Sequence, residues 1–221
     1  MTNLVASATS PDLGALYRSA RERITALAVG PLIDPTLVVP ATPEWSVHDV
    51  IAHLSGIAVD GTSGNMEGAP GDAWTAAQVA RNVDRSIAEM LAEWTLVGPL
   101  MEGFLSSPAG QNASSAVIDI HTHEADLRHA LGLPVAVPSD FLAWAGPRLR
   151  DGFNAAVEKA GLAPVTVVVS DLELFRGRLG RRTDGEVLAL EWSTPAAEYL
   201  DLFFIFGRAE QSLGESVGSG E

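Results

Sequence analysis

The chain has 221 residues, a formal net charge of −14 and a sequence pI near 4.6. This length allows one large domain, or one domain with a small second one, and an acidic chain is a poor partner for nucleic acid or an anionic membrane. The absence of cysteine excludes disulfides, thiolate metal ligands and a cysteine nucleophile.

Residues 1–10 are polar and lack the basic start and apolar centre of a signal peptide. No apolar run approaches the length that crosses a bilayer, so we expect a cytoplasmic protein without membrane contact. A first helix is predicted from Pro11 to about Val29, with Ser10 as its cap, because apolar residues then recur at helical spacing.

A second helix is predicted from Ser46, since Ser46 and Asp49 have the spacing of a capping box. Its apolar stripe is interrupted by His53. A glycine-rich loop is expected over residues 60–73, followed by a long third helix over 74–105.

The fourth helix carries the most informative pattern, and it is predicted to end at Gly132. At about 100° per residue, Asp119, His123 and Asp126 fall within about 60° of one another on its surface. A carboxylate and an imidazole four residues apart can therefore reach the same point in space. His121 is turned about 160° away from His123 and cannot share that point.

The four helices predict a mainly α protein, a four-helix bundle over residues 1–134. A small C-terminal α/β domain is expected over 139–210 and a disordered tail over 211–221. The elements expected in the C-terminal domain are a helix at 141–160, a strand at 165–169, a hairpin of 172–179 with 186–192, and a helix at 195–206.

His53, Asp119 and His123 form a candidate metal site of two imidazoles and a carboxylate. Three protein ligands leave coordination positions open, as in a catalytic metal site, and this donor set suits zinc, with nickel or iron as alternatives. Asp126 could orient a ligand or a bound water, which makes it the candidate catalytic residue. Spacing alone leaves another interpretation open, in which His53 is a hydrogen-bonded core histidine and Asp119 pairs with His123 across one turn.

Other polar pairs favour structural roles. Glu124 with Arg128, and the adjacent Arg181 and Arg182, are interpreted as solvated surface groups, although the arginine pair could also bind an anionic substrate. The sequence contains no phosphate loop or dinucleotide fingerprint.

Three segments resemble one known family. Residues 45–54 (WSVHDVIAHL) are similar to the W-[ST]-V-x-D-x-x-A-H-L motif of the mycothiol-dependent maleylpyruvate isomerase family, part of the DinB-like bundle superfamily. Residues 119–132 resemble its E-x-x-x-H-x-x-D-L motif, which is followed by A-L-G, and residues 195–208 resemble its closing helix, which ends in Gly-Arg.

The resemblance implies a DinB-like four-helix bundle with a small C-terminal α/β domain. It also implies a metal, usually zinc, held by a histidine of the second helix and by the E-x-x-x-H pair. His53 and His123 match these positions, whereas Asp119 stands where the family has glutamate. Aspartate is one methylene shorter than glutamate. The fourth helix must therefore approach the metal more closely, or the carboxylate must bind the metal through a water molecule, or the site must lose metal affinity.

The resemblance further implies chemistry with a low-molecular-weight thiol such as mycothiol, because a metal lowers the pKa of a thiol and so supplies a thiolate. We therefore expect a metal- and mycothiol-dependent isomerase or S-transferase, whose partners are the thiol cofactor and a small electrophilic substrate. The alternative is a non-catalytic DinB-like module that binds a small molecule or a partner. The identity of the substrate and the oligomeric state remain open.

Overall fold

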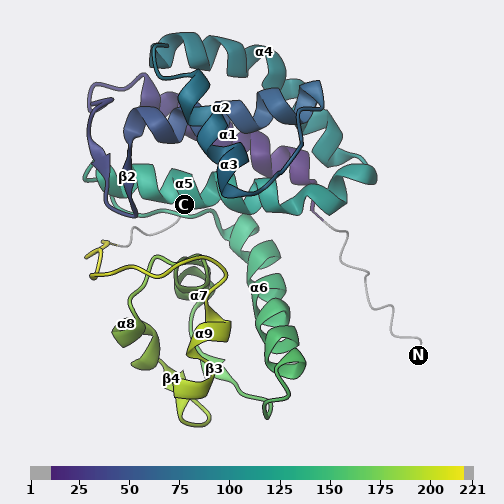
Figure 1. Ribbon diagram of the computed structural model, residues 1–221, viewed down its shortest axis with the longest axis vertical. Coiled ribbons are helices and arrows are strands. Elements are labelled where there is room, and N and C mark those ends of the chain that lie inside the picture. The colour runs from purple at the N-terminus through teal and green to yellow at the C-terminus, as the bar shows by residue number, and fades with distance from the viewer. Residues whose placement is uncertain (1–10, 217–221) are drawn as a thin grey trace, which may run out of the picture.

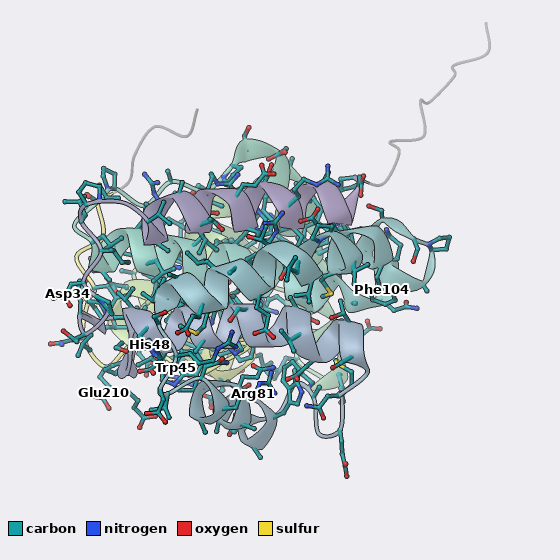
Figure 2. All side chains as sticks on the ribbon, turned by 90° about the horizontal axis from the view of Figure 1, so that it is seen from above. Asp34, Trp45, His48, Arg81, Phe104 and Glu210 are labelled. Carbon is teal, nitrogen blue, oxygen red and sulfur yellow. The ribbon has the colours of Figure 1, made fainter. Side chains whose placement is uncertain are left out.

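The computed structural model describes residues 11–216. Four helices form the bundle of Figure 1: α1 (Leu13–Ala28), α2 (Val47–Ser63), α4 (Ile87–Ser106) and α5 (Ser114–Ala130). Helices α4 and α5 each contact both α1 and α2, which closes the ring of four. Figure 2 shows α4 lying between α1 and α2, with Phe104 towards one end of α4 and Trp45 beside the start of α2. The predicted mainly α class is confirmed.

The helix starts follow from their caps. Ser46 and Asp49 form the predicted capping box, so α2 begins directly after strand β2 (Thr42–Ser46). The first helix is instead capped by Asp12, whose carboxylate accepts the N–H groups of Gly14 and Ala15. The cap expected at Ser10 lies outside the described residues.

The predicted loop over 60–73 is shorter in the structure, because α2 continues to a left-handed glycine, Gly64, with φ of 81°. The prediction of a single helix over residues 74–105 is wrong. Its place is taken by α3 (Asp72–Arg81) and by α4, which starts at its own capping box of Ser86 and Glu89. Sequence periodicity did not separate these two helices.

Two short segments lead into α2 and α5. Strands β1 (Val38–Val39) and β2 (Thr42–Ser46) pair antiparallel and lead into α2. The 3₁₀ turn η1 (Ala109–Ala113) leads into α5, whose last helical residue is Ala130 and whose C-terminal turn is closed by the predicted Gly132. Gly132 has φ of 71°, and the N–H of Leu133 donates to the carbonyl of Arg128, as in a Schellman motif.

Figure 1 shows α6 leading from the bundle into the smaller C-terminal unit. Its elements are α6 (Ser139–Lys159), β3 (Val167–Val168), α7 (Asp171–Arg178), α8 (Asp184–Leu188), β4 (Glu191–Trp192), the 3₁₀ turn η2 (Ala196–Glu198) and α9 (Leu200–Phe203). Strands β3 and β4 pair antiparallel, with Val167 opposite Trp192. This two-stranded sheet is the expected small β component.

The hairpin predicted from 172–179 and 186–192 is wrong, because helix caps override the loose alternation of the sequence. Ser170 accepts the N–H of Glu173 and starts α7. Thr183 and Glu186 form a capping box that starts α8. The helix predicted at 195–206 is reduced to the turn η2 and the short α9. No helix within residues 11–216 has the length and apolar character needed to cross a membrane.

Candidate metal centre

His53 of α2 and Asp119 and His123 of α5 meet inside the bundle. Oδ2 of Asp119 lies 3.3 Å from Nε2 of His53, and Oδ1 lies 3.6 Å from Nε2 of His123. One ligand atom from each of the three residues lies within 4.8 Å of the other two. The side chain of Asp119 is 31% exposed, whereas those of the two histidines are buried. The structure thus assembles the predicted triad, and Asp119 has the most exposed side chain of the three, although its Oδ2 atom is buried.

The spacing of these atoms fits a metal site. Zinc bonds of about 2.0–2.2 Å in a tetrahedral arrangement separate neighbouring ligand atoms by about 3.3–3.5 Å. Two nitrogen–oxygen separations are close to that value, 3.3 Å from His53 Nε2 to Oδ2 of Asp119 and 3.6 Å from His123 Nε2 to Oδ1 of the same carboxylate. Aspartate is therefore long enough to reach both histidines at this packing distance of α2 and α5.

The other ring nitrogen of each histidine faces a fixed partner. Nδ1 of His53 lies 2.8 Å from Oε1 of Gln78, and Nδ1 of His123 lies 3.3 Å from Oδ2 of Asp126. The His123 contact is close, but it is poorly aligned for a hydrogen bond. Metal-binding histidines commonly hold the outer ring nitrogen in this way, so that the inner nitrogen points at the metal.

The electrostatics of the triad favour a cation between its members. Burial raises the pKa of Asp119, but His53 and His123 outweigh it, and the net pKa lies below the usual value. Burial lowers the pKa of His53, but the Asp119 carboxylate and the Gln78 hydrogen bond raise it above 6.5 overall. Oδ2 of Asp119 is buried and has no aligned hydrogen bond within residues 11–216. Such an oxygen is suited to a metal ion.

Trp45 forms one wall of the triad. Its ring centroid lies 5.1 Å from that of His53 and 5.8 Å from that of His123. Trp45 directly precedes Ser46, the cap of α2, so the capping box that starts the helix also places this ring. Trp74, Trp94 and Trp144 are buried, whereas Trp45 is half-buried against the candidate site.

Asp126 is fully buried and lies between the bundle and the C-terminal unit. Its carboxylate pairs with Arg176 at 2.8 Å and with Arg181 at 2.6 Å. Burial raises the pKa of Asp126, but Arg181 and Arg176 outweigh it and hold the pKa well below 3.8. Arg181 is 8% exposed, so its interpretation as a solvated turn residue was wrong. An acid so firmly ionised can orient His123, but it is a poor proton donor.

Arg176 was missed because its segment was predicted as a strand. It also pairs with Glu215, which pairs in turn with Arg182 at 2.7 Å. The N–H of Val135 donates to the carbonyl of Ser216 at 2.8 Å. Residues 211–216 therefore differ from the disordered tail that their composition predicted, and residues 217–221 lie outside the described chain.

The remaining polar residues of α5 serve the fold. His121 stacks on Phe141 with a centroid distance of 3.8 Å, and burial lowers its pKa to about 4, so it stays outside the triad as predicted. Glu124 does not pair with Arg128. It is buried, and its carboxylate accepts two hydrogen bonds from Arg23 of α1, at 2.6 and 2.7 Å.

The fold and site define a mainly α protein with a buried candidate metal group of two histidines and an aspartate. The chain matches no protein-family model, and comparisons with curated proteins and with solved structures gave no significant match.

Proposed function

We propose that His53, Asp119 and His123 bind a divalent metal ion, with zinc as the first candidate and nickel or iron as alternatives. The observation that carries the proposal is the convergence of both histidine Nε2 atoms on one carboxylate, at 3.3 and 3.6 Å. Two imidazoles and one carboxylate form the donor set of open, catalytic zinc sites.

We further propose that the protein is an isomerase or S-transferase that uses a low-molecular-weight thiol, mycothiol, on a small electrophilic substrate. The support for the thiol is the sequence resemblance of residues 45–54 and 119–132, and the absence of cysteine is compatible with a thiol supplied by a cofactor. A bound metal would lower the pKa of a thiol and so supply a thiolate at neutral pH. Asp126 would hold the ring of His123, and Trp45 would shield one side of the site from water.

A second candidate function is a binding module without a metal. It is favoured by one observation: a protonated His53 can itself pair with Asp119 at the observed 3.3 Å. In that case the triad is a buried ion pair that stabilises the contact of α2 with α5.

Metal analysis after zinc-replete purification separates the two functions. The wild type should hold one zinc per chain, and His53→Ala and Asp119→Ala should hold none. The matched control is His48→Ala, which removes a histidine from the same helix but outside the triad, because His48 Nε2 contacts the carbonyl of Arg85. A wild type without zinc would sink the metal proposal.

The thiol is tested after the metal. Zinc-loaded wild type should transfer or isomerise an electrophile from a panel in the presence of mycothiol, and His53→Ala should not. Zinc binding with no reaction under any thiol would leave the metal site standing and reject the enzymatic proposal.

A further inference from the structure

A chain of three polar side chains, the first two of them buried, leads away from His53 on the side opposite Asp119. Nδ1 of His53 lies 2.8 Å from Oε1 of Gln78, and Nε2 of Gln78 donates to Oδ2 of Asp60 at 2.9 Å. The other carboxylate oxygen, Oδ1 of Asp60, lies 2.8 Å from Nη2 of Arg81. Gln78 is completely buried, and Asp60 is 2% exposed.

The direction of this chain is fixed by chemistry. An ionised carboxylate can only accept hydrogen bonds, and Asp60 is ionised, because Arg81, Gln78 and Asn65 lower its pKa against the opposing effect of burial. The amide nitrogen of Gln78 must therefore face Asp60, and its carbonyl oxygen must face His53. A carbonyl oxygen only accepts, so Nδ1 of His53 must carry a proton.

We infer that Asp60 and Gln78 are positioning residues that set the tautomer of His53. With the proton on Nδ1, the neutral ring has its lone pair on Nε2, which is the nitrogen that faces Asp119. That lone pair is what a metal ion needs. The inference rests on the proposed metal function and deepens it: the acidic residue two turns along α2 decides which histidine nitrogen is available.

The variant Asp60→Asn should reverse the donor and acceptor roles along this chain without removing a hydrogen bond. In Asp60→Asn the side-chain oxygen has to face Arg81 and Asn65, since both are donors to Oδ1 of Asp60. The new amide nitrogen then faces Gln78. Gln78 must turn its amide over, present its nitrogen to His53, and so place the His53 proton on Nε2. A ring protonated on Nε2 can donate to Asp119 but cannot bind a metal there.

The first measurement is made on the metal-free protein at a pH where His53 is neutral. Long-range ¹H–¹⁵N correlation spectra distinguish the two tautomers, and the His53 signals are assigned by their loss in His53→Ala. The chain has five histidines, so the spectra are simple. We expect the Nδ1–H tautomer in the wild type and the Nε2–H tautomer in Asp60→Asn.

The second measurement is zinc affinity by competition with a chromogenic chelator. Loss of an outer partner of a histidine ligand costs about 10- to 100-fold in metal affinity, and we expect Asp60→Asn and Gln78→Leu to lose that much. The matched control is Asn65→Ala, which also removes a hydrogen bond to Asp60 but keeps the direction of the chain. Its affinity and tautomer should be those of the wild type.

The outcomes separate this inference from the metal proposal. The inference is overturned if the wild type has the Nε2–H tautomer of His53. It is also overturned if Asp60→Asn keeps the Nδ1–H tautomer, or if Asp60→Asn binds zinc as tightly as the wild type. Should Asp60→Asn not fold, Gln78→Leu replaces it, and wild-type zinc affinity in that variant overturns the inference as well. If the wild type binds no zinc, the metal proposal fails alone, and the tautomer comparison still decides the role of Asp60.

Discussion

Nε2 of His53 lies 3.3 Å from Oδ2 of Asp119, and no well-aligned hydrogen bond within residues 11–216 accounts for this carboxylate oxygen. Because Nδ1 of His53 faces the carbonyl oxygen of Gln78, a neutral His53 would point a lone pair at an anion. A cation between the two residues removes that conflict, and it can be a proton or a metal ion.

A proton and a metal ion should therefore compete for the space between His53 and Asp119. For the metal-free protein, the raised pKa of His53 gives the direction in which folding stability changes with pH. In the metal-free folded protein this pKa lies above its ordinary 6.5, because Asp119 and Gln78 outweigh the effect of burial. The stability gained from the proton is complete below about pH 6.5 and is lost as pH rises through the raised pKa. Urea denaturation of the metal-free protein across this range should show the loss, and Asp119→Asn should show a smaller one.

The length of the acidic ligand can be tested with Asp119→Glu. The aspartate already lies 3.3 and 3.6 Å from the two Nε2 atoms, so an added methylene has to be accommodated in a packed site. We expect zinc affinity to fall by about tenfold, equivalent to about 1.4 kcal/mol. Tighter binding in isothermal titration would mean that aspartate weakens the site and that the observed spacing is not that of the metal-bound state.

The fluorescence of Trp45 should report on metal binding. Its ring centroid is 5.1 Å from that of His53, so a quenching metal such as Cu²⁺ bound at the triad lies beside it. Addition of one equivalent of Cu²⁺ should quench part of the emission, and this part should be absent in Trp45→Phe. Equal quenching in both proteins would place the metal elsewhere.

Two arginines near Glu124 should differ in their effect on stability. Arg23 donates two hydrogen bonds to the buried Glu124, whereas Arg128 donates to the carbonyl of Pro134. Arg23→Ala leaves a buried carboxylate without its partner, and we expect a loss of about 1–3 kcal/mol. Arg128→Ala serves as the control, with a loss of less than about 1 kcal/mol. Thermal unfolding of both variants decides between this arrangement and the Glu124–Arg128 pair that sequence spacing favours.

Glu215 should contribute to acid stability. Burial raises the pKa of Glu215, but Arg176 and Arg182 lower it by more than burial raises it. The net pKa therefore lies below 4.5. Its contribution is present above the unfolded value of 4.5 and is lost as pH falls through the lower folded value. Glu215→Gln should be less stable at neutral pH by about 1–3 kcal/mol and should show a weaker dependence on acid. An unchanged acid denaturation curve would contradict a structural role for residues 211–216.

The site was more predictable from sequence than the C-terminal unit, for physical reasons. A helical wheel places Asp119 and His123 on one face, and the apolar stripe around His53 turns that residue inward. What spacing could not show was that α2 and α5 pack against each other. The resemblance of residues 45–54 to a known motif supplied that expectation, and the contact of His53 with Asp119 confirms the pairing.

The prediction of the C-terminal unit failed in short segments whose sequence carries both a strand pattern and a helix cap. Residues 172–179 alternate loosely, yet Ser170 caps a helix there, and packing of that helix buries Leu174 and Phe175. Gln78 and Arg176 were missed because neither lies in a sequence pattern with the residue it contacts. Burial of Asp126 would have required a cation nearby, but only tertiary structure identifies Arg176 and Arg181 as its partners.

The pairing of Asp126 with Arg176 also bears on how the chain can be divided. Cutting it after residue 134 would leave a buried carboxylate on the bundle and two buried guanidinium groups on the other fragment. Removing one side of a buried ion pair typically costs about 3–5 kcal/mol, a large part of the stability of a small domain. We therefore expect the intact protein to unfold in one cooperative transition, and the separated halves to regain their structure only when mixed.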